Sequence, residues 1–123
     1  MSSFRKEAAD AIRAALPKKW VFIDDERSLN VLSKPTLVMS QRDLEPSPIA
    51  PLSYLSITLA LIVLSEHTDP VKAEDALDDL LVEVLNIVQS FGNLTWSKAT
   101  KIVHQERHMG YEITTQATIQ LEH

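Results

Sequence analysis

The residues of this sequence that are best suited to chemistry are two histidines and one acid at alternate positions. His104, Glu106 and His108 share one face if their segment is a straight strand, and two imidazoles with a carboxylate suit zinc. Gly110 follows at once, and glycine favours a turn that would break this geometry. Two readings stay open: a metal site, which would make the protein an enzyme, and a solvated strand end. We favour the strand end.

A second candidate is an acidic face on a strongly amphipathic segment. It consists of Glu74, Asp75, Asp78, Asp79 and Glu83. Carboxylates one helical turn apart bind metals in bundles when other helices supply facing ligands. A single helix supplies none, so the spacing favours a solvated face. In an oligomer such a face would repel a nucleic-acid backbone or meet a basic patch on a neighbour.

Other kinds of catalysis lack the residues that they need. The 123 residues include no cysteine and only two glycines, which excludes thiolate chemistry and glycine-rich phosphate loops. No serine occupies a nucleophile elbow. The net charge of −5 argues against specific nucleic-acid binding, and no segment has the roughly 18 apolar residues of a membrane span. We therefore expect no enzyme activity, catalytic residue, cofactor, metal or membrane contact.

The hydropathy pattern predicts one α+β domain over residues 1–123. Helices are expected at 3–16 and 70–91, and strands at 20–23, 36–42, 54–64, 94–106 and 112–121. This order, α-β-β-β-α-β-β, predicts a mostly antiparallel sheet of about five strands with two helices packed on one side. Glu122 and His123 resemble the remnant of a C-terminal purification tag.

Two segments carry the clearest structural signals. Between Tyr54 and Leu64 every second residue is apolar, which is typical of a strand with one buried face. The helix at 70–91 has one apolar stripe and begins with Asp69 and Pro70, a good cap and a good first residue. A turn is expected at 107–110, before the last strand.

A proline-rich segment at residues 43–52 separates the second and third strands. Its three prolines cannot donate to a ladder, so we expect a long hairpin loop. Long loops are commonly functional or mobile, and a partner contact and a disordered connection are both open readings. The residues expected at a partner contact are Arg42, Asp43, Leu44, Glu45 and Ile49.

The last strand has an almost uncharged polar face. Thr114, Gln116 and Thr118 alternate with Ile113, Thr115 and Ala117. The polar face is either simply solvated or an interface, because charge is depleted at interface cores. An uncharged strand at a sheet edge also invites pairing with another chain. We therefore add Thr114, Gln116 and Thr118 to the expected interface.

The layout resembles the tail terminator proteins of long-tailed bacteriophages. The residues that carry the resemblance are the opening run from Phe4 to Ile12, Pro17, Trp20-Val21, the prolines at 46, 48 and 51, and Ile113-Thr114-Thr115. The resemblance spans nearly the whole chain and rests on the order of elements, without a diagnostic motif.

The resemblance implies a homohexameric ring that caps the phage tail tube, stops its polymerisation and joins it to the head. The implied partners are further copies of the chain, the tail tube protein and a head completion protein. The implied location is the tail of the virion, after assembly in the host bacterial cytoplasm. The alternative is a small dimeric adaptor or ligand-binding module of the α/β sandwich type, which a ring-sized assembly would exclude.

Overall fold

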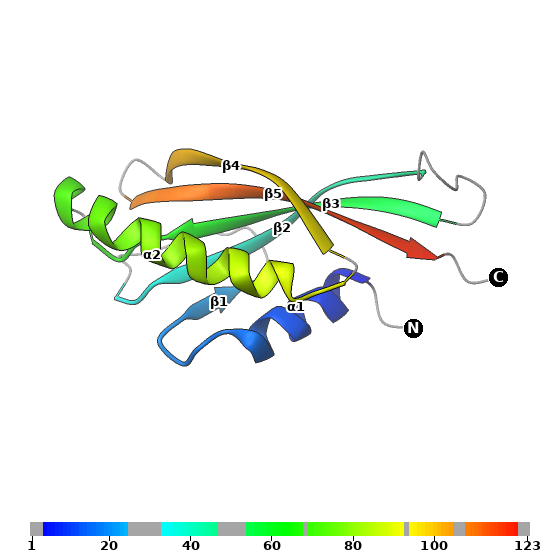
Figure 1. Ribbon diagram of the computed structural model, residues 1–123, viewed down its shortest axis with the longest axis horizontal. Helices are drawn as coiled ribbons and strands as arrows, with labels where there is room; N and C mark the ends of the chain where they lie inside the picture. Colours follow the sequence, from blue (N-terminus) through cyan, green and yellow to red (C-terminus); the bar gives the residue numbers. More distant parts are fainter. Residues whose placement is uncertain are drawn as a thin grey trace.

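The computed structural model describes residues 4–24, 33–46, 54–67, 69–92, 94–104 and 108–120. Its seven elements are α1 (Phe4–Ala15), β1 (Val21–Ile23), β2 (Thr36–Pro46), β3 (Tyr54–Leu64), α2 (Pro70–Gln89), β4 (Leu94–His104) and β5 (His108–Gln120) (Figure 1). The predicted α+β class and the order α-β-β-β-α-β-β are confirmed.

The five strands form one sheet in the order β1-β2-β3-β5-β4. β1 pairs with β2 in parallel over three residues, whereas the other three pairings are antiparallel. β3 and β5 occupy central positions and pair along almost their whole lengths. The sheet is therefore mostly antiparallel, as expected, with one short parallel strand at its edge.

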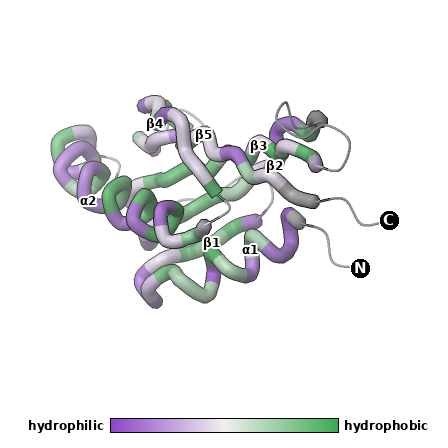
Figure 2. Tube along the Cα trace, turned by 45° about the vertical axis from the view of Figure 1, so that its right-hand side comes forward, coloured by the Kyte–Doolittle hydropathy of each residue, from purple (hydrophilic) through white to green (hydrophobic). Residues whose placement is uncertain are grey.

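The main core lies between one face of the sheet and the two helices (Figure 2). Its buried members include Ala9 and Ile12 of α1, Leu77, Leu80, Val84 and Val88 of α2, and Leu37, Met39, Leu59, Leu61, Val63, Ile113 and Ala117 of the strands. Each large apolar side chain that is buried here contributes roughly 1.5–3 kcal/mol. This face of the sheet is called the helix face below, and the opposite one the open face.

The second helix begins where the sequence indicates. The side chain of Asp69 accepts a hydrogen bond of 3.1 Å from the backbone N–H of Val71, and Pro70 is the first helical residue. The helix ends at Gln89, where the hydroxyl of Ser90 donates to the carbonyl of Ile87 at 2.6 Å. These caps pair backbone groups that have no partner inside the helix.

A smaller cluster lies on the open face at one end of the sheet. Val38, Ile62 and Leu64 are buried there, with Ile23 and Ile102 packed against them. Residues 61–64 of β3 are consequently buried on both faces. Partly exposed and buried positions therefore alternate only from Ser56 to Leu59 of this strand.

The expected loop at 43–52 begins too early. β2 continues through Asp43 and Leu44 to Pro46, which lies opposite Leu55. A proline is tolerated here because it ends the strand, and beyond Val38 no other described strand pairs with the outer side of β2. Residues 47–53, which include Ile49, lie outside the described residues.

The expected turn at 107–110 is also wrong. β5 begins at His108, and Gly110 lies within the strand opposite Leu64 and Ile102. A Cβ atom at Gly110 would clash with the carbonyl oxygen of Val63 and would lie 2.7 Å from Cδ2 of Leu64. This glycine therefore permits a close approach to β3 instead of forming a turn.

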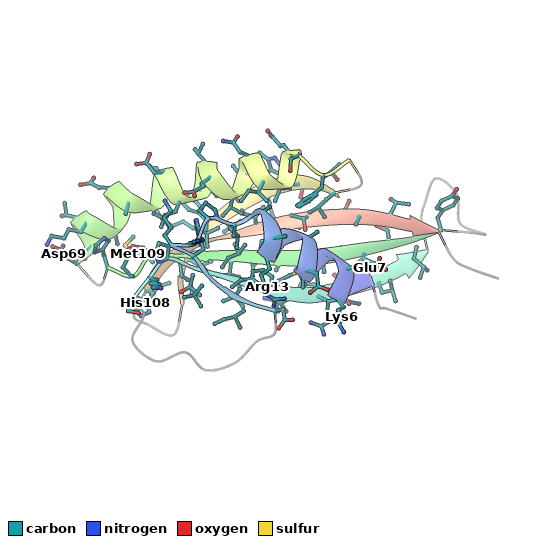
Figure 3. All side chains as sticks on the ribbon, turned by 90° about the horizontal axis from the view of Figure 1, so that it is seen from below. Lys6, Glu7, Arg13, Asp69, His108 and Met109 are labelled. Carbon is teal, nitrogen blue, oxygen red and sulfur yellow. The ribbon has the colours of Figure 1, made fainter. Side chains whose placement is uncertain are left out.

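The sheet extends past its helices at the end where β2 finishes and β3 begins. There β2, β3 and β5 continue beyond α1 and α2 (Figures 1 and 3). We call this end of the sheet the arm; it consists of residues 43–46 of β2, 54–58 of β3 and 116–120 of β5. Ile57 and Ala117 in its inner part are still buried on the helix face, so only the outer part of the arm lies beyond the helices.

Candidate interaction surface

The open face of the arm carries a polar patch made by two neighbouring strands. The cross-strand pairs are Ser56 with Thr118, Thr58 with Gln116, and Ala60 with Thr114. We call Ser56, Thr58, Thr114, Gln116 and Thr118 the polar patch. All five are uncharged and at least partly exposed. The structure thus brings together the three predicted residues of β5 and adds two from β3.

The alternation predicted for the last strand is confirmed. Ile113, Thr115 and Ala117 are buried on the helix face, while Gln116 and Thr118 are exposed. The buried hydroxyl of Thr115 donates a hydrogen bond of 2.9 Å to the carbonyl of Leu59. Gln116 and Thr118 lie on the other face of the sheet from Thr115, so they face away from the core and are available to a partner.

An ion pair separates the polar patch from the apolar cluster on the same face. Arg42 is the extra residue of a bulge in β2, and its Nη2 lies 3.1 Å from Oε1 of Glu112 in β5. The two side chains are 39% and 35% exposed, so this pair contributes at most about 1 kcal/mol. The position of the pair is more informative than its energy, because it lies where the open face changes from buried apolar residues to accessible polar ones.

The other residues predicted at the contact lie on different faces of the arm. Asp43 is exposed and lies opposite Thr58 on the open face. Leu44 lies opposite Ile57, a core residue of the helix face, and is itself 54% exposed. Glu45 is paired with Ser56 in the register. The predicted set is thus one region of the chain but not one surface.

Both long edges of the sheet carry a bulge followed by a charged residue. In β2 Asp43 follows the bulge at Arg42, and in β4 Lys98 follows the bulge at Ser97. Asp43 and Lys98 are exposed, and no described residue forms an ion pair with either of them. These bulges leave no clear mark in the sequence, because they depend on how each strand pairs with its neighbour.

The acidic side of α2 is only partly a solvated face. Asp75, Asp78 and Asp79 are exposed, as expected. Glu74 accepts a 2.6 Å hydrogen bond from Nζ of Lys101 in β4, and this bond raises the pKa of Lys101 above its ordinary value. The helix is therefore tied to the edge strand by one of its own acids.

The expectation of a solvated side chain is wrong for Glu83. Its two oxygens accept from Nε1 of Trp20 at 3.1 Å and from Nζ of Lys19 at 2.9 Å. Trp20 is buried at the end of the segment that links α1 to β1, so its indole N–H needs an acceptor. Glu83 supplies it across a long separation in sequence, which periodicity alone does not reveal.

The histidine at position 108 is buried rather than located in a solvated turn. His108 is 2% exposed, and among the described residues neither of its ring nitrogens has a hydrogen-bond partner. It lies with Met109 at the end of the sheet opposite the arm (Figure 3). His104 is its cross-strand neighbour in the register, while Glu106 lies outside the described residues.

No group of three or more metal-ligating side chains occurs among the described residues. A scan against protein-family models and a search of curated proteins gave no match for this chain. Within the described part of the chain, no helix is long and apolar enough to cross a membrane. The surface features of the sheet are therefore the basis for a proposal.

Proposed function

We propose that this chain is a structural subunit that assembles with copies of itself into a closed ring, most simply a hexamer. We further propose that the ring is a phage tail terminator, which caps the tail tube, stops its polymerisation and joins it to the head. The observation that carries the proposal is the arm, whose outer part extends beyond both helices (Figure 1).

The chemistry of the arm suits contact with protein. Its open face carries the polar patch, whose five side chains have no charge to desolvate. Charge depletion is the compositional mark of an interface core. On the other face, Leu44 offers an apolar side chain that is 54% exposed. Burial of the polar patch therefore carries no cost of desolvating charge, and burial of Leu44 is favourable.

The assignment to phage tails is supported by the layout resemblance and by the element order on which it rests. In this proposal the subunits contact one another, the tail tube protein and a head completion protein, and the ring is part of the virion tail. The chain contributes surfaces for assembly, and no catalytic step is assigned to it.

A dimeric adaptor is the second candidate, and one observation favours it. Hydroxyl and amide side chains both donate and accept hydrogen bonds, so the polar patch is complementary to itself. Two copies could pack their open faces about a two-fold axis, which is the commonest symmetry of oligomers. The measured mass distinguishes a dimer from a ring.

Light scattering at several protein and salt concentrations tests the ring. The expected result is a closed species of about six subunits that grows at the expense of monomer. A stable dimer would support the adaptor, and a monomer at the highest concentration would count against both.

A capping assay tests the terminator. The protein is added to polymerising tail tube protein, and tube lengths are measured by electron microscopy. We expect shorter tubes with wild type and longer ones with Thr118→Lys, which puts a charge into the polar patch. Gln89→Lys, on the exposed side of α2, is the matched control and should cap like wild type. Equal tube lengths with and without wild type would exclude capping.

A further inference from the structure

We propose that neighbouring copies join through the two free edges of the sheet. Residues 39–46 of β2 in one copy pair antiparallel with residues 94–101 of β4 in the next. The five-stranded sheet then continues from subunit to subunit. The inference rests on the proposed assembly into a ring and goes beyond it by naming both contact surfaces.

Both edges have backbone groups without a strand partner. β1 pairs with β2 only at Thr36, Leu37 and Val38, and the described strands leave the rest of that edge open. β4 pairs with β5 on one side and with no described strand on the other. A free strand edge presents N–H and C=O groups that a strand of another chain can pair with.

The directions of the strands fit such a contact. β2 is antiparallel to β3, β3 to β5, and β5 to β4, so β4 runs opposite to β2. A copy related by rotation about an axis along the strands keeps these directions. Its β4 therefore meets β2 of its neighbour in the antiparallel sense, which is also the sense of most pairings within the subunit.

Asp43 and Lys98, for which no described residue forms an ion pair, lie where this contact needs them. In the register of the sheet, Asp43 lies beside Thr58, whose next neighbour across the sheet is Gln116. Lys98 lies beside Thr114, whose next neighbour is Ala60. Thr58 and Ala60 are two residues apart on β3, so Asp43 and Lys98 lie on the same face at levels two residues apart. A shift of two residues between copies places Asp43 opposite Lys98. The same shift sets 94–101 against 39–46, which is the length that β1 leaves free.

The charges also disfavour the wrong pairings. Two β4 edges paired about Lys98 would bring the Lys98 side chains of both copies together, and two β2 edges paired about Asp43 would do the same with Asp43. Like charges across strands destabilise a pair, whereas opposite charges stabilise it. A contact between two different edges is heterologous, and such contacts close into rings when the rotation allows.

Cysteine cross-linking tests the contact directly, since the chain has no cysteine of its own. The double variant Asp43→Cys with Lys98→Cys is oxidised and run on a denaturing gel without reductant. We expect a ladder of dimer, trimer and larger species that ends at the ring. The matched control replaces Asp43→Cys by Asp75→Cys on α2 and should stay monomeric on the gel.

The single variants and a charge exchange complete the test. Asp43→Cys alone and Lys98→Cys alone should give no covalent dimer. Asp43→Lys should weaken assembly at least tenfold, and adding Lys98→Asp should restore it. Circular dichroism shows that each variant is folded.

The outcomes separate this inference from the proposed function. Light scattering that shows a ring without the ladder, or with efficient dimers of a single variant, overturns the edge contact and leaves the ring intact. A monomer at all concentrations overturns both.

Discussion

The two ends of the long strands differ in how far they are buried. Leu61 and Leu55 are both apolar, and both lie on the helix face of β3, yet Leu61 is fully buried and Leu55 is partly exposed. The difference is that α1 and α2 cover the body of the sheet as far as Ile57 and Ala117 and stop before the outer part of the arm (Figure 1). Alternation along a strand thus identifies its apolar face but not how much of that face the same chain covers.

The open face shows the same division. Toward β1 it buries Val38, Ile62 and Leu64, and beyond the Arg42–Glu112 pair it exposes the polar patch. Substitutions of buried residues in the body should therefore change stability, and substitutions of exposed residues in the arm should change assembly. The following predictions test this division, beginning with the largest effect.

Truncation of the helix core should have the largest effect on stability. Leu77 is fully buried between α2 and the sheet, and Leu77→Ala should lower the free energy of unfolding by about 2–5 kcal/mol. Urea denaturation measures this free energy. Asp78→Ala, on the exposed side of the same helix, is the control and should stay within about 0.5 kcal/mol. Equal losses would mean that α2 packs differently.

A methyl group at Gly110 should be the next most costly change. Gly110→Ala places a Cβ against the backbone of Val63 and the side chain of Leu64, so β3 or β5 must shift. Overpacking of this kind costs about 1–3 kcal/mol. Gly92→Ala is the control, because no atom lies within 4 Å of its added Cβ. A neutral Gly110→Ala in thermal unfolding would show that the two strands are farther apart.

Removal of the acceptor for Trp20 should cost an amount in the lower part of the same range, because Glu83 is itself partly exposed and water can reach its place. Glu83→Ala leaves the buried indole N–H without a partner, and an unsatisfied buried donor costs about 1–3 kcal/mol. Glu83→Gln keeps an acceptor for Trp20 and should recover most of the loss. If both variants lose the same stability in urea, the ion pair with Lys19 matters more than the indole contact.

A change at His108 should stabilise the protein. Because neither ring nitrogen has a hydrogen-bond partner in the described part of the chain, His108→Met removes two unsatisfied polar atoms while roughly keeping the volume. We expect a gain of about 1–2 kcal/mol, measured as a higher urea midpoint. A loss of stability would show that the imidazole has a partner or ligand in solution.

The smallest effect on stability is expected in the arm. Leu44→Ser removes an apolar side chain that is already 54% exposed, so unfolding should change by less than about 0.5 kcal/mol. Assembly, followed by light scattering, should weaken at the same time. A variant that is destabilised but still assembles would place Leu44 in the core of the body. It would contradict the prediction that exposed arm residues serve assembly and not stability.

Local signals in the sequence predicted the elements well. The period of two from Tyr54 to Leu64 matches β3 residue for residue, and Asp69 with Pro70 marks the start of α2. These signals depend on residues a few positions apart, which is the range over which strand alternation and helix capping act. The polar row of Thr114, Gln116 and Thr118 was visible for the same reason, and its role as an interface stays a prediction.

Features that depend on distant residues were missed. Glycine and proline predict a turn and a loop, but Gly110 lies in a strand where β3 comes close, and Pro46 ends β2 at an edge that no described strand covers. The metal reading of His104 and His108 assumed one straight strand, whereas the two lie on different strands.

The sequence by itself determined the element order, the buried stripe of α2 and the alternating faces of β3 and β5, because these follow from local periodicity. Only the tertiary structure decided the strand order, the bulges at Arg42 and Ser97, and the end of the sheet that stays uncovered. Strand pairing and helix length set these features jointly. Asp43 and Lys98 therefore come to the same face and nearly the same level through contacts that no short segment of the sequence contains.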